Sequence, residues 1–154
     1  MRPPGLLDGM SGTAQHLGTI ESLCTLPFPD ADSSAGYGSS GPCHHLVTLL
    51  HAPEGDPADS GDEEIEDQFA SEREALALLL TVRGWGPPDR FALTGAAPRA
   101  GDTPLPAPWD HLALTVPDVH LWRRADRWTG LGTAHHGPGL PLALVAFTTT
   151  QDPP

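Results

Sequence analysis

The chain has 154 residues and a formal net charge of −12, which arises from 20 acidic and 8 basic residues. This length is typical of one domain with a single hydrophobic core. All of the basic residues are arginines. Because a chain this acidic lacks the basic surface that neutralises nucleic-acid phosphates, we expect no nucleic-acid binding. The absence of lysine, with abundant Ala, Gly and Pro, is typical of a GC-rich bacterial gene.

The apolar runs of the chain are short. The longest, 75–80 and 140–147, fall far below the roughly 20 residues that span a bilayer. The first residues also lack the continuous apolar stretch of a secretory signal. We therefore expect a soluble, cytoplasmic protein without membrane contact, in which Cys24 and Cys43 are free thiols.

Residues 1–42 are predicted to be a disordered or loosely structured segment. Pro, Gly, Ser and Asp dominate it; a weak alternation over 17–26 allows a marginal strand, and 27–42 reads as a linker. Residues 36–41 match G-x-G-x-x-G, but they lack the flanking strand and helix of a dinucleotide site. We therefore expect no cofactor, and we place a single α+β domain at 43–150.

One long amphipathic helix is predicted over 60–83. Ser60 and Glu63 have the spacing of a capping box, and Gly84 suits the left-handed position after the last turn. An apolar stripe follows the helical period through Ile65, Phe69, Leu76, Leu79, Leu80 and Val82. This stripe should cover one face of a sheet.

Strands are predicted at 45–51, 90–94, 119–124, 127–134 and 140–147, whereas 109–116 is ambiguous between helix and strand. A turn at 125–126 pairs Arg124 with Arg127 and brings Arg123 beside Trp128. The last strand is apolar on both faces, so it should be central or covered. The expected fold is α+β, with a mostly antiparallel sheet of about four strands, one long helix on one face and an irregular N-terminal region.

These features favour a non-enzymatic protein-interaction or regulatory module with a protein partner. Tryptophan and arginine are frequent at interface hot spots, and acidic side chains attract basic partners. The two candidate surfaces are a sheet face with Trp122, Arg123, Arg124 and Trp128, and the start of the long helix with Asp62, Glu63 and Glu66.

A small hydrolase-like enzyme is the first alternative, since a carboxylate beside an imidazole can support acid–base chemistry. The sequence contains no G-x-S-x-G, H-E-x-x-H or Walker motif, so the non-enzymatic interpretation is preferred. The candidate imidazoles are those of His111, His120, His135 and His136, with Asp110 or Asp118 as the orienting carboxylate.

A metal-binding regulator is the second alternative. Thiolate and imidazole ligands occur close together in this chain, but the short spacings of structural zinc sites are missing, so we expect no metal. The candidate ligands are Cys24, Cys43, His44 and His45.

Overall fold

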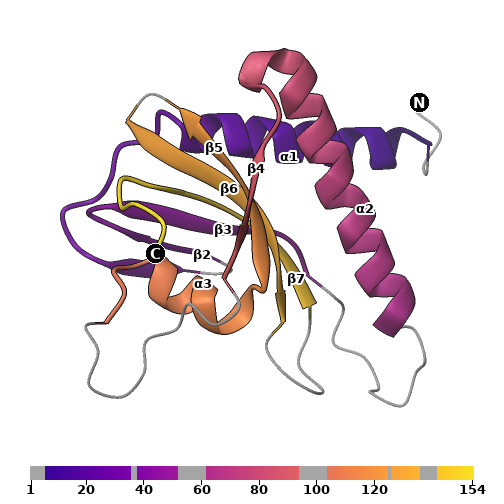
Figure 1. Cartoon of the computed structure of the whole chain (residues 1–154). Helices are drawn as coiled ribbons and strands as arrows, with labels where there is room; N and C mark the ends of the chain where they lie inside the picture. Colours follow the sequence, from indigo (N-terminus) through magenta and orange to yellow (C-terminus); the bar gives the residue numbers. More distant parts are fainter. Residues whose placement is uncertain (1–5, 36–37, 52–61, 94–103, 125, 136–141) are drawn as a thin grey trace.

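The computed structural model describes residues 6–35, 38–51, 62–93, 104–124, 126–135 and 142–154 as an α+β fold (Figure 1). In this part of the chain seven strands form one antiparallel sheet in the order β1-β2-β3-β7-β6-β5-β4, so the expectation of about four strands was wrong. The strands are β1 (Ser33–Ala35), β2 (Gly38–Gly41), β3 (His44–His51), β4 (Asp89–Ala92), β5 (Asp118–Arg124), β6 (Arg127–His135) and β7 (Leu142–Thr149). The helices are α1 (Leu6–Leu23), α2 (Asp62–Leu80) and α3 (Trp109–Thr115), and a π-helical turn, η1 (Thr81–Trp85), follows α2.

Helices cover both faces of the sheet: α1 and α2 lie on one side and α3 on the other (Figure 1). Strand β7 lies between β3 and β6, as its two apolar faces predicted. Because successive side chains of a strand point to opposite faces, Leu144 and Ala146 pack towards α1 and α2, whereas Val145 and Phe147 pack towards α3.

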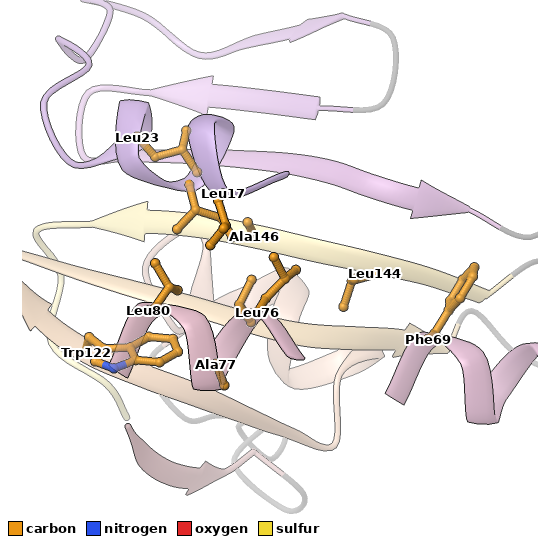
Figure 2. Packing of buried hydrophobic residues seen from close by; sticks show 11 residues of the cluster. Leu17, Leu23, Phe69, Leu76, Ala77, Leu80, Trp122, Leu144 and Ala146 are labelled. Atoms are coloured by element: carbon orange, nitrogen blue, oxygen red, sulfur yellow. The ribbon is translucent and has the colours of Figure 1, made fainter. Parts of the chain in front are cut away.

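The long amphipathic helix predicted over 60–83 is present as α2, although residues 52–61, including Ser60 of the capping box, lie outside the described residues. Leu76 and Leu80 are fully buried against the sheet (Figure 2). The predicted stripe fails at Val82, which is 71% exposed. At 3.6 residues per turn, Val82 lies about 160° around the helix from Leu80 and therefore faces away from the sheet. Gly84 has φ of 106°, the left-handed conformation predicted at the helix end.

The N-terminal region is not irregular, because α1 occupies residues for which a loose segment and a marginal strand were predicted. Leu17, Ile20 and Leu23 recur every three residues and are buried in the same core cluster as α2 (Figure 2 labels Leu17 and Leu23). Burial of this stripe stabilises a helix that contains Gly12 and Gly18, each of which lowers helix propensity. The predicted linker contains strands β1 and β2. The domain boundary placed after residue 42 stays a prediction.

The hairpin of β5 and β6 has the predicted register, with Arg124 opposite Arg127 and Arg123 opposite Trp128. The Arg123 guanidinium carbon lies 5.0 Å from the centre of the Trp128 ring. The ambiguous segment 109–116 forms α3, whose apolar side packs on the sheet face opposite α1 and α2. This short helix positions the site described next.

Candidate functional site

Helix α3 is too short to cover its face of the sheet. Its seven residues extend only about 10 Å at 1.5 Å per residue, whereas seven strands spaced about 4.8 Å apart span nearly 30 Å. Trp109 and Leu112 fix the helix over β5, β6 and β7 and are fully buried. The Trp109 ring meets Phe147 edge to face at 5.3 Å, and its Nε1 donates to the Gln151 carbonyl at 2.9 Å. No described helix covers the part of this face formed by β2 and β3, so among the described residues that part is open.

A pocket of about 480 Å³ lies between α3 and this open part of the sheet. Its apolar lining comes from Leu46, Ala107, Pro108, Leu112, Ala134 and Val145, and its polar lining from Ser39, His44, Thr48, Asp110, His111 and Thr115. A second pocket of about 240 Å³ adjoins it, shares Ser39, His44 and Ala107 with it, and adds Asp32, Ser33 and Ser40. We call the two together the α3 pocket. Its combined volume is that of a small-molecule site.

His44 stands where the two halves of the α3 pocket meet, and only 7% of it is exposed. It is the first residue of β3 and pairs directly with Gly41 of β2. A Cβ on Gly41 would lie 2.8 Å from His44 Cε1 and closer still to the Asp32 carboxylate. The missing side chain of Gly41 therefore makes the space in which the imidazole and the carboxylate approach one another.

Burial lowers the pKa of His44, and the neighbouring His45 lowers it further, while the carboxylates of Asp32 and Asp110 act in the opposite direction. The desolvation effect is the largest. His44 is therefore mainly neutral at physiological pH, with one ring nitrogen able to accept a hydrogen bond.

Three groups of the α3 pocket, Asp32, His44 and Asp110, form no side-chain–side-chain hydrogen bond within the described ranges. The ring nitrogens of His44 make no hydrogen bond there, and neither Asp32 nor Asp110 forms an ion pair with a described residue. Asp110 Oδ1 accepts the backbone N–H of His111 at 2.7 Å, which holds that carboxylate at the start of α3.

His45, in contrast, has a structural role on the opposite face. Its Nδ1 lies 2.7 Å from Ser40 Oγ, its Nε2 lies 3.0 Å from the Pro27 carbonyl, and its ring stacks on Phe28 at 5.0 Å. The Nδ1 contact therefore joins β3 to β2, while the Nε2 contact and the ring stacking hold the segment between α1 and β1 against the sheet.

The four candidate metal ligands do not converge. His44 and His45 point to opposite faces of β3, and Cys24 Sγ lies 3.6 Å from Thr129 Oγ1 on the α1 side. Cys43 lies in the turn between β2 and β3, where its carbonyl accepts from Thr149 Oγ1 at 2.8 Å. Among the residues that the structure describes, no group of three or more His, Cys, Asp or Glu side chains is arranged to hold a metal ion.

The four predicted sheet-face residues are divided between the two faces. Trp122 is 3% exposed, belongs to the core under α2, and donates from Nε1 to the Gly86 carbonyl at 2.9 Å. Trp128 lies on the α3 side with Arg123. Arg124 stacks on Trp85, with 4.9 Å between the guanidinium carbon and the ring centre. These side chains therefore do not form one shared surface.

The acidic residues at the start of the long helix lie in the first turns of α2. Glu66 is exposed, whereas for Asp62 and Glu63 the structure describes the backbone alone. Their role as a docking surface for a basic partner stays a prediction.

Of the acid–base candidates, His120 has a carboxylate partner, but a different one from those predicted. Its Nε2 lies 2.7 Å from Glu74 Oε1 of α2, and this hydrogen bond is the largest cause of a lowered Glu74 pKa. Arg90 also contacts Glu74, at 3.2 Å, and Arg73 bridges Glu74 and Asp118 at 3.6 Å to each. This network joins α2 to β4 and β5, and none of its members lines the α3 pocket.

The other predicted acid–base residues have separate positions. His111 and Asp110 line the α3 pocket. The side chain of His135 and all of His136 lie outside the described residues. The sequence interpretation missed the grouping of Asp32, His44 and Asp110, which come from three segments separated by up to 78 residues. The one local signal for it was Gly41, three residues before the start of β3, and a glycine in a segment rich in Gly and Ser did not indicate a close approach of side chains.

Comparison with known proteins adds no family to this description. No protein-family model, curated protein or solved structure matches the chain. Among the described helices, none combines the length and the apolar character needed to cross a membrane. The proposals below therefore depend on the geometry of the site itself.

Proposed function

We propose that this protein is a non-enzymatic binding or regulatory module and that the α3 pocket is where it takes its ligand. The observation that carries the proposal is the buried, neutral His44 at the junction of an apolar chamber and a carboxylate-lined one. The His44 ring nitrogens face the pocket without a partner among the described residues, so a ligand that hydrogen-bonds to the imidazole gains affinity and orientation.

The apolar chamber supports the same proposal. Leu46, Ala134 and Val145 form a floor from three neighbouring strands, and Leu112 of α3 forms one wall. An occupant that covers this floor removes apolar surface from water, which is the main favourable term in most association. A few polar groups above an apolar floor are typical of sites that hold small organic molecules.

A screen of small organic fragments by ¹H–¹⁵N NMR tests the proposal. We expect fragments to shift the amide signals of Ser39, His44 and Thr115, and the variant Thr48→Phe, which fills the chamber, to abolish those shifts. Thr25→Phe, in the exposed turn after α1, is the matched control and should leave them unchanged. Shifts that persist in Thr48→Phe, or that map away from the pocket, would contradict the assignment.

A protein partner remains part of the proposal as the second candidate. The net charge of −12 favours a basic partner, and the acidic first turns of α2 offer such a partner a place to dock. Cytoplasmic location is likewise a proposal, supported by the composition of the chain. The acid–base alternative is supported by the hydrogen bond between His120 and Glu74, but this pair lies apart from the α3 pocket.

A further inference from the structure

We infer that the α3 pocket binds a primary ammonium group carried on an apolar stem. This inference rests on the proposed function and names the chemistry of its ligand. Asp110 lines one chamber of the pocket and Asp32 the other, and both supply acceptor oxygens; the imidazole of His44, which lines both chambers, supplies a third acceptor. A primary ammonium has three N–H donors and no acceptor, so its hydrogen-bonding capacity matches this set.

The charge balance around His44 selects a cation over an anion. The two carboxylates carry negative charge without an ion-pair partner among the described residues, and the chain as a whole carries −12. The six arginines that the structure describes are engaged elsewhere: Arg73, Arg83, Arg90, Arg123, Arg124 and Arg127. A carboxylate-bearing ligand would be repelled, whereas a cation would be attracted and held.

Hydrogen-bond geometry distinguishes a primary ammonium from a quaternary one. His44 is more than nine-tenths buried, and the acceptor nitrogen of a neutral imidazole gains a partner only from a ligand that carries an N–H or O–H donor. A trimethylammonium group has the charge but no such donor, so it leaves the imidazole unpaired. The apolar chamber beside His44 then accommodates the stem over Leu46 and Val145.

Calorimetric titration of the whole chain with four hexyl compounds tests this inference. We expect hexylamine to bind at least about tenfold more tightly than 1-hexanol or hexyltrimethylammonium, since a charge-assisted hydrogen bond contributes more than a neutral one. Hexanoate should not bind measurably. Equal affinity for hexylamine and hexyltrimethylammonium would overturn the role of the N–H donors. Binding of hexanol or hexanoate in preference to the amine would contradict the ammonium site but would still support a ligand pocket. If none of the four compounds bound, both the ammonium site and the proposed ligand pocket would be contradicted.

Charge-neutralising variants locate the site. Asp32→Asn and Asp110→Asn should each weaken hexylamine binding by about tenfold and leave hexanol unaffected. Asp89→Asn is the matched control, because it changes the net charge equally but lies on β4, at the opposite edge of the sheet from β1. An equal loss in Asp89→Asn would mean a long-range charge effect and would overturn the inference.

The ammonium can belong to a free amine or to the lysine of a partner protein, and a further titration distinguishes the two. A short acetylated, amidated peptide with one central lysine that binds as tightly as hexylamine would support a lysine side chain as the source. Binding of hexylamine without binding of the peptide would support a small amine. Either result is consistent with an ammonium site at Asp32, His44 and Asp110.

Discussion

Helix α1, which the sequence did not predict, can be tested through Gly12 and Gly18 in its interior. A Cβ added at Gly12 or Gly18 meets no other atom within 4 Å, so replacement by alanine changes the backbone preference and little else. Glycine is less favourable than alanine in a helix interior by about 1 kcal/mol. The double variant Gly12→Ala/Gly18→Ala should therefore gain about 2 kcal/mol, since the two sites make no shared contact.

Thermal unfolding followed by circular dichroism gives the measurement. For a chain of this size each kcal/mol shifts Tm by about 2–4 °C, so the double variant should unfold about 4–8 °C higher than the wild type. Gly18→Pro is the opposite control: proline removes a helical hydrogen bond and costs about 3 kcal/mol in a helix interior, so Tm should fall. If both variants left Tm unchanged, α1 would not be a helix that contributes to the stability of the fold.

Two further predictions concern α2. Leu76→Ala should lower the free energy of unfolding in urea by about 2–5 kcal/mol, because Leu76 is fully buried. Val82→Thr should change that free energy by less than about 0.5 kcal/mol, because Val82 is largely exposed. Similar losses in the two variants would mean that Val82 is buried in the core. The hydrogen bond from His120 lowers the pKa of Glu74 from its ordinary 4.5, so the stability that Glu74 contributes is present above that pH and is lost as the pH falls through its lowered folded value. Glu74→Gln should therefore be less stable than the wild type near neutral pH, with a gap that narrows below about pH 4.5 in urea unfolding; a gap that stays constant with pH would contradict this role.

The sequence predicted best where one local pattern decides the structure. The helical period of the apolar residues predicted α2, and the glycine at position 84 predicted the positive φ found after the helix. The two-residue turn predicted the register of β5 and β6. It failed where local preference and burial disagree. The glycines and polar residues of α1 gave a weak pattern, and this helix is stabilised by burying Leu17, Ile20 and Leu23 against elements far along the chain.

The candidate site shows the same division. Sequence identified His44 and Asp110 as chemically capable residues and placed His44 at the edge of a strand. Their convergence with Asp32 depends on the short length of α3, on the pairing of β2 with β3, and on the space beside Gly41. Composition and periodicity determined the class of fold, because they act within one element. Only the tertiary structure brought the three acceptors together, because strand order and the coverage of a sheet face are set by contacts between residues distant in sequence.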